Sequence, residues 1–145
     1  MTVRAWALDR LVSQTNLQVF DGRPDDSNPS VGYGAPSRDV AIDPDGRAHM
    51  YACLYTGAAM PGEDERLTGT GGTLGATFQV TAAGGDQNRC ELAVAKVLAA
   101  LHGQRLPGGG ICRVDPFDPI PRTDDAPSPS RTYLPLIFRV AVGDA

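Results

Sequence analysis

Histidine and cysteine side chains are the first candidates for chemistry, because they bind transition metals and serve as bases or nucleophiles. His49 and Cys53 fall on the same side of an expected strand, four residues apart. A strand rises about 3.3 Å per residue, which separates the pair by roughly 13 Å, too far to share one ion. His102 falls in the last turn of an expected helix, where an imidazole complements the helix dipole. Both histidines are therefore interpreted as structural residues.

Acidic and glycine-rich motifs suggest other kinds of site. Asp43-Pro44-Asp45-Gly46 resembles the start of a calcium loop, but the later ligands and the closing glutamate are missing. The glycine-rich run 69–75 precedes an expected strand rather than a helix, and no Gly-Lys-Ser/Thr follows it, which disfavours a phosphate loop. A Gly-x-Ser-x-Gly nucleophile motif is also missing. Adjacent acids lie in polar stretches typical of solvated surface, at Asp25-Asp26, Glu63-Asp64-Glu65 and Asp124-Asp125. The sequence predicts no enzyme, no cofactor and no metal site.

Composition predicts one domain spanning the 145 residues, with 41% hydrophobic and 21% charged residues in an ordinary globular balance. The net charge of −4 and the lack of a basic block disfavour sequence-specific nucleic-acid binding. No run of 18 apolar residues and no signal-peptide pattern is present, so neither a membrane span nor a leader is expected. The three cysteines have no CxxC spacing and are interpreted as reduced, buried thiols of a cytosolic protein: Cys53, Cys90 and Cys112.

The sequence predicts two amphipathic helices. The first is expected over Val3–Gln14, with Thr2 as its N-cap. Its apolar stripe consists of Val3, Ala7, Leu8, Leu11 and Val12. The second begins after the N-cap Asp86 and ends at Gly103. Its apolar face consists of Cys90, Val94, Val97, Leu98 and Leu101.

Strands are expected where apolar residues alternate with polar ones. The expected strands are Leu17–Phe20 (ended by Asp21-Gly22), Ala48–Tyr55, Thr73–Thr81, a short one near Ile111–Val114, and Leu134–Val142. The second and third should pair antiparallel, and the second helix should pack on the face formed by Leu74, Ala76, Phe78 and Val80. Pro135 lacks an N–H group, which places it at a strand start or a sheet edge.

Three long loops separate these elements, at residues 23–46, 57–72 and 115–131. They are rich in Pro, Gly, Asp and Ser and show no sustained period. The expected fold is therefore α+β: a small, mainly antiparallel or mixed sheet with both helices on one face and long Pro/Gly-rich loops.

Several short runs, in this order along the chain, resemble those of a known protein family. They are Val19-Phe20-Asp21-Gly22, Tyr51–Tyr55, Gly75–Thr81, Val97–Leu106 and Tyr133–Val142. Together they resemble the tail terminator, or tail completion, proteins of long-tailed bacteriophages with non-contractile tails. The similarity spans most of the chain and consists of element order and small motifs.

The resemblance implies a structural virion protein. Such a protein forms a ring, typically of six subunits, that caps the tail tube, stops its polymerisation and offers a head–tail joining surface. Its implied partners are the major tail tube protein and a head-side connector, while DNA passes through the lumen without sequence-specific binding. The implied location is the tail or neck of the virion, reached from the host cytoplasm during assembly. No cofactor and no membrane are implied.

Two of the loops hold the candidate subunit or tube contacts. An isolated domain gains little from ordering the arm 57–72, because fixing loop residues costs conformational entropy. Its candidates are Met60, Glu63, Asp64, Glu65, Arg66 and Leu67. In the loop 115–131, prolines stiffen the chain around two apolar residues that lack periodic partners, Phe117 and Ile120.

Two alternatives remain open from the sequence. One is another neck, head-closure or minor tail ring protein of the same virion, since fold alone does not separate these. The other is a small host cytosolic ligand-binding α+β domain. A gene position among tape-measure and major tail genes would distinguish the virion proteins from the host domain.

Overall fold

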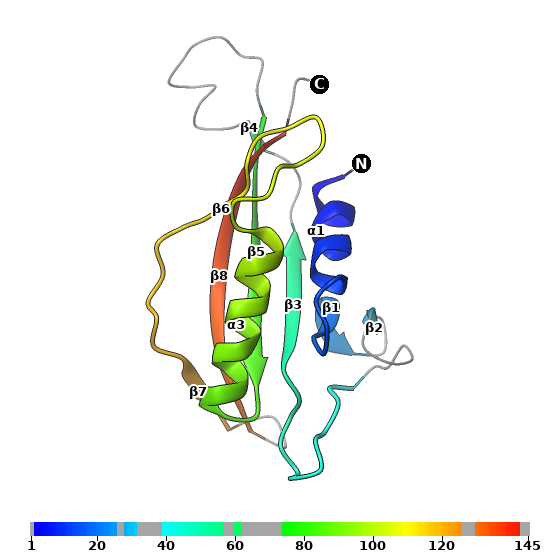
Figure 1. The fold of residues 1–145 in the computed structure, drawn as a ribbon, viewed down its shortest axis with the longest axis vertical. Helices are drawn as coiled ribbons and strands as arrows, with labels where there is room; N and C mark the ends of the chain where they lie inside the picture. Colours follow the sequence, from blue (N-terminus) through cyan, green and yellow to red (C-terminus); the bar gives the residue numbers. More distant parts are fainter. Residues whose placement is uncertain are drawn as a thin grey trace.

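A computed structural model describes residues 2–25, 28–31, 39–56, 60–61, 74–125 and 130–142. Figure 1 shows the order and arrangement of its elements. The helices are α1 (Val3–Val12) and α3 (Gln87–Leu101). The strands are β1 (Gln18–Asp25), β2 (Asn28–Val31), β3 (Tyr51–Thr56), β4 (Met60–Pro61), β5 (Leu74–Gly84), β6 (Arg113–Val114), β7 (Arg122–Asp124) and β8 (Arg131–Val142).

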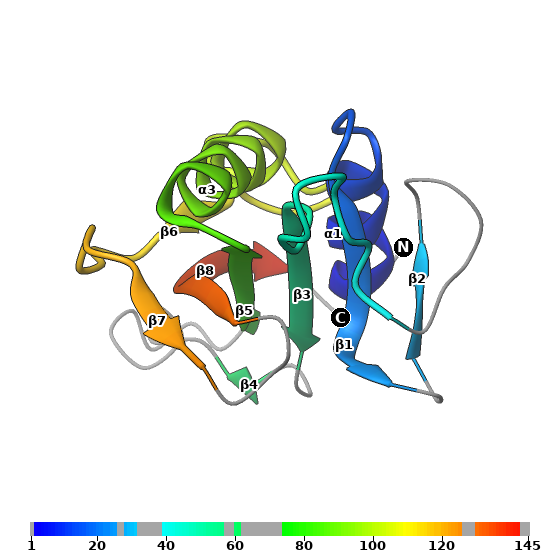
Figure 2. The same cartoon turned by 90° about the horizontal axis from the view of Figure 1, so that it is seen from below.

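All of these strands join one sheet, in the order β2-β1-β3-β5-β8-β6, with β4 added to β5 and β7 added to β8. Only β1 and β3 pair parallel among the described strands, and the other pairs are antiparallel. Both helices lie on the same face of the sheet (Figure 2). The predicted α+β class, with a mixed sheet and two helices on one face, is confirmed.

Each helix begins at the predicted capping residue. The Thr2 hydroxyl accepts a hydrogen bond from the backbone N–H of Ala5, and the Asp86 carboxylate accepts one from that of Arg89. The first helix ends at Val12, two residues earlier than expected, and Val12 is 40% exposed rather than buried. Trp6, which the predicted stripe omitted, is buried instead.

The main core fills the space between the helices and the sheet. Strands contribute Val19, Leu54, Val80, Leu136 and Phe138 among others, and α3 contributes Cys90, Ala93, Val97, Ala100 and Leu101. As predicted, α3 packs on the face of β5 that carries Phe78 and Val80. Val94 and Leu98 are half-buried at its margin, because the buried stripe of α3 is turned toward Ala93 and Ala100.

A second, smaller cluster lies on the opposite face of the sheet. It consists of Phe20, Ala48, Tyr51, Cys53 and Ala83, with Val40 and Tyr133 packed against it. The rings of Phe20 and Tyr51 meet edge to face, with their centroids 6.0 Å apart. Residues 51–54 are consequently buried on both sides of β3.

All three predicted loops contain strands, and β4 lies within the expected arm 57–72. The first strand does not stop at Asp21-Gly22: it continues to Asp25 through an irregular pairing with β2, and Gly22 adopts a φ of 91°. The strand β2 itself lies within the expected loop 23–46. Likewise β7 lies within the expected loop 115–131 and pairs with the start of β8. These pairings join distant or bulged segments, so no local period marks them.

The last strand, β8, has β5 on one side and the two short strands β6 and β7 on the other. On that outer side, the Ile137 carbonyl accepts a hydrogen bond from the backbone N–H of Asp115. Alternate residues direct their backbone groups to the same side, so the nitrogen of Pro135 also points outward, between the partners of β7 and β6. Pro135 therefore removes no bond to β5, but it lies within β8, beside the interval between β7 and β6, rather than at the predicted strand start or sheet edge.

Candidate functional site

The predicted contact residues of the arm fall at one end of the sheet. Met60 belongs to β4, which pairs with the first residues of β5 (Met60 with Gly75, and Pro61 with Leu74). Glu63, Asp64, Glu65, Arg66 and Leu67 lie outside the described residues. The pairing places the beginning of the arm against the end of β5 that extends beyond β3, since β3 pairs only with Phe78–Ala83.

The two other candidates lie in residues 115–121, which we name the strap. It links β6 to β7 along the outer side of β8 (Figure 1). Phe117 is half-buried and packs against the chain's own main core. Ile120 is 70% exposed, the largest exposed fraction among the large hydrophobic residues of the described chain. The structure thus separates the pair: Phe117 anchors the strap to the subunit, and Ile120 is free for an external contact.

Several polar contacts hold the strap in place. Arg139 Nε donates to both carboxylate oxygens of Asp115, at 2.9 and 2.8 Å. The N–H of Asp115 donates to the Ile137 carbonyl, and the Asp118 carboxylate accepts the N–H of Ile120 at 3.0 Å. With Pro119 and Pro121 on either side of Ile120, the backbone has little freedom left to lose.

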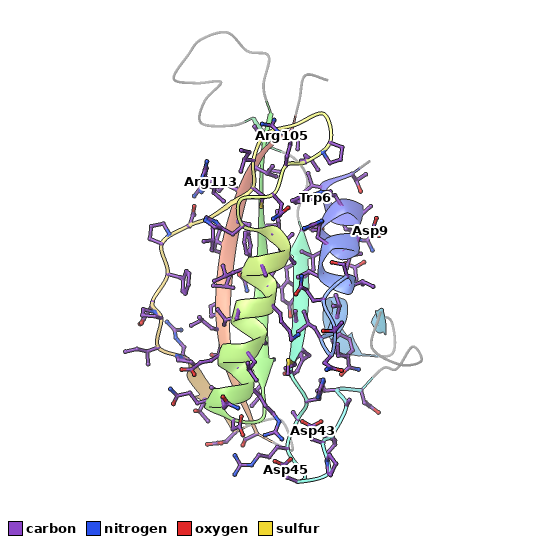
Figure 3. All side chains as sticks on the ribbon, in the orientation of Figure 1. Trp6, Asp9, Asp43, Asp45, Arg105 and Arg113 are labelled. Atoms are coloured by element: carbon purple, nitrogen blue, oxygen red, sulfur yellow. The ribbon has the colours of Figure 1, made fainter. Side chains whose placement is uncertain are left out.

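The largest charged cluster surrounds Arg89 on the first turn of α3, and the sequence did not indicate it. Its guanidinium donates to three carboxylates: Nε to Asp43 at 2.8 Å, Nη2 to Asp45 at 2.8 Å, and Nη1 to Asp86 at 2.6 Å. Arg47 also donates to Asp86, at 3.2 Å. Asp43 and Asp45 lie at the lower end of the molecule in Figure 3. Three charged side chains of one turn (Asp43, Asp45 and Arg47) thus meet Asp86 and Arg89 at the start of α3.

His49 connects this cluster to the first helix and strand. Its Nδ1 lies 2.9 Å from an Asp43 oxygen, and its Nε2 lies 2.5 Å from the backbone carbonyl of Asn16. Asn16 ends the connection from α1 with a φ of 60°. These contacts give His49 a structural role, but it precedes β3 and does not lie in the strand expected over Ala48–Tyr55. His102 accepts the backbone N–H of Val114 through Nδ1, at 3.1 Å, and so ties α3 to β6.

Ion pairing sets the protonation of the cluster. Partial burial raises the pKa of Asp43, but hydrogen bonds from Arg89 and His49 outweigh this and hold that pKa below its usual value. A backbone hydrogen bond from Arg47, together with Arg89, lowers the pKa of Asp45. Hydrogen bonds to Asp43 and Asp45 in turn raise the pKa of Arg89. The carboxylates of the cluster are therefore paired with the Arg89 guanidinium of the same chain. Such pairing stabilises the contact between the 43–47 turn and α3.

Replacing Arg89 by leucine tests this role through pH. The folded pKa values of Asp43 and Asp45 are lowered, so their stabilising effect is present above about pH 4 and is lost as the pH falls further. We expect Arg89→Leu to lower the urea midpoint clearly at pH 7 and much less at pH 3, where protonation relieves the repulsion of the carboxylates. Lys96→Leu, which removes a cation from the same helix, is the matched control. An equal loss at both pH values would contradict the assigned role.

The three cysteines are buried and unpaired, as predicted. Burial raises the pKa of Cys53 and Cys112 to about 12 and that of Cys90 to about 11. Such thiols stay protonated at neutral pH and are poor nucleophiles or metal ligands.

On the sheet face opposite the helices, Arg131 lies over the ring of Tyr133, 5.0 Å from its centroid, and donates to the Tyr51 hydroxyl at 3.3 Å. Burial raises the pKa of Tyr51, although Arg131 opposes this effect. Asp124 of β7 lies 3.6 Å from Arg131 Nε. These contacts join the start of β8 to β3 and β7.

Within the described residues, no three His, Cys, Asp or Glu side chains are placed to share a metal ion. Nor is any helix there both long and apolar enough to cross a membrane. The chain was also compared with known proteins. No family model matches it, and no curated protein is similar to it in sequence.

Proposed function

We propose that this chain is a structural ring subunit of a phage virion that acts as a tail terminator. Its ring caps the finished tail tube, stops tube polymerisation and provides the surface that joins the tail to the head. The proposal starts from the resemblance in element order and short motifs, and three properties of the described structure support it.

The observation that carries the proposal is the unequal length of the strands. β5 pairs with β8 along all of Leu74–Gly84, whereas its pairing with β3 begins only at Phe78. Four residues of β5 and the end of β8 therefore project past β3 at the end where the arm begins (Figure 1). A projecting ribbon on a rigid body suits contact with a second assembly, here the last ring of the tail tube.

The sheet also ends in two different edges. β2 forms one edge, while β6 and β7 form the other, on the opposite side of the molecule (Figure 2). A cyclic ring needs a heterologous interface, in which one surface of a subunit meets a different surface of its neighbour. Two unlike edges on opposite sides meet this need.

The charge of the chain fits a channel for DNA. With a net charge of −4 and no basic block, the subunit offers no dense positive surface to retain a duplex as it passes. In a ring through which DNA passes, such a composition would reduce electrostatic binding of the DNA phosphates to the channel.

The proposal is tested by tube assembly. Tail tube protein encoded in the same genome should polymerise in vitro into tubes of uncontrolled length. Adding this chain should give shorter tubes that carry an extra ring at one end, as seen by electron microscopy. The same protein denatured by heat is the control. Tubes of unchanged length without an end ring would contradict the terminator function, and a ring seen only at the head connector would favour a neck protein.

A further inference from the structure

The strap edge presents an apolar side chain between two cations. Ile120 is 70% exposed on the stiffened strap described above. Arg113, just before the strap, and Arg122, just after it, are both exposed. Within the described part of the chain, neither guanidinium has an ion pair or a hydrogen bond to a side chain, so both remain available to an external anion. We name these three residues the strap edge.

The first helix presents an outward flank of opposite character. Arg10 of α1 donates to the Ala100 carbonyl of α3, and Arg4 pairs with Asp21 of β1, so these two directions around the helix are occupied. The direction left over carries Ala5, Asp9 and Val12, all exposed, with Val12 at 40%. Asp9 makes no ion pair with any other described residue. We name these residues the α1 flank.

The two surfaces lie on opposite sides of the molecule. In Figure 3, Arg113 is at the left side and Asp9 at the right, with the sheet and α3 between them. Each surface joins an exposed branched aliphatic side chain to charge, positive on the strap edge and negative on the α1 flank. The two are therefore complementary between copies, and within one copy they are too far apart to meet.

We propose that the strap edge of one subunit docks on the α1 flank of the next, with Ile120 packing near Val12 and Arg122, two residues after Ile120, facing Asp9. This contact rests on the proposed ring function and names the surface that closes the ring. The occupant is a second copy of this chain. A symmetric contact between two strap edges is disfavoured, because it would bring unpaired arginines of the same sign together.

Cysteine cross-linking tests the contact. In an Ile120→Cys/Val12→Cys double variant, the new thiols of neighbouring subunits should meet, and mild oxidation should produce a ladder of covalent oligomers on a denaturing gel. The native cysteines are each at most 1% exposed and should not take part. The oxidation is run on the free protein and on the protein bound to tail tubes. Each single variant should stay largely monomeric on the gel.

The matched control is Ile42→Cys/Val12→Cys. Ile42 is 52% exposed, but it lies beside the Asp43 turn at the end of the molecule and not on the strap. This pair should give no ladder. Charge reversal provides a second measurement: Asp9→Arg should raise the dissociation constant of the ring about tenfold, and adding Arg122→Asp should restore part of the affinity.

The outcomes separate the contact from the function. A ladder in the Ile120/Val12 double variant alone supports the contact, even if the tubes remain uncapped and the terminator function fails. Rings that cap tubes without a ladder overturn the contact and leave the function standing. A protein that stays monomeric both free and with tubes overturns both.

Discussion

Replacing Phe138 by alanine should lower the free energy of unfolding by about 3–5 kcal/mol. The Phe138 side chain is fully buried in β8 and stacks on Phe78 of β5, with their ring centroids 5.4 Å apart and an interplanar angle of 15°. The two residues are direct cross-strand partners. They lie in the main core, which both helices cover, so truncation removes contacts with several elements and leaves a cavity that a packed sheet does not refill.

A urea titration at constant pH measures this loss, with an unchanged slope showing that the unfolded state is the same. Ile120→Ala is the matched control, because Ile120 is also a large apolar residue but is 70% exposed, and we expect a change within about 0.5 kcal/mol. A loss under about 1 kcal/mol for Phe138→Ala would show that the two faces of the core do not meet there.

Local signals in the sequence predicted the helices well. The caps Thr2 and Asp86 are decided by side chains within three residues of the N–H groups they accept, so their types are informative on their own. The buried side of α3 was placed less well. Its hydrophobic pattern favoured Val94 and Leu98, whereas the fold buries Ala93 and Ala100 fully and leaves Val94 and Leu98 half-buried.

The sheet was harder to predict where pairing is short or irregular. β2 and β7 each contain three or four residues and exist through pairing with β1 and β8. Asp21-Gly22 predicted the end of the first strand, and this prediction is wrong. Gly22 does adopt the positive φ of a turn residue, but β1 continues past it to Asp25. A glycine with a positive φ serves a turn and a bulge equally well, and the local sequence does not distinguish them.

The Arg89 cluster shows a different limit. Asp43 and Arg89 are 46 residues apart in the sequence, and the pairing of β3 with β5 brings their segments together. The acidic motif 43–46 forms a turn: the Gly46 N–H donates to the Asp43 carbonyl, with a Gly46 φ of 81°. The identity of its cationic partner depends on the fold and has no spacing rule.

The contact candidates were predicted with mixed results. Prolines flank Ile120 on both sides, and hydrogen bonds of Asp115 and Asp118 hold the strap in place. Whether an apolar loop residue faces the chain's own core or the outside depends on its three-dimensional neighbours. Phe117 packs against the main core, whereas Ile120, three residues later, is exposed. In the sequence, both are apolar residues of a proline-rich loop, and nothing there distinguishes the buried one from the exposed one.

Replacing Gly85 by alanine should cost about 1–3 kcal/mol, because the site is already filled on the side where the new methyl group would lie. Gly85 follows β5 directly, and a Cβ there would lie 2.5 Å from the backbone nitrogen of Ala48 and 2.7 Å from the Cβ of Arg47. These are backbone and stem atoms that cannot swing away. The two segments must separate, which weakens the hydrogen bond from the Gly85 N–H to the Ala48 carbonyl, now 2.9 Å long.

Gly110→Ala is the control for this substitution, since a Cβ there would meet only the Ala141 side chain at 3.2 Å and its backbone at 3.7 Å. Its loss in the same urea titration should be clearly smaller. Separation at Gly85 would also move Asp43 and Asp45 away from Arg89, so the Gly85→Ala and Arg89→Leu losses at pH 7 should be less than additive in the double variant. Simple additivity would show that the close approach at Gly85 and the Arg89 cluster are independent. Coupling would show that one glycine, by admitting the 43–49 turn to the start of α3, allows that cluster to form.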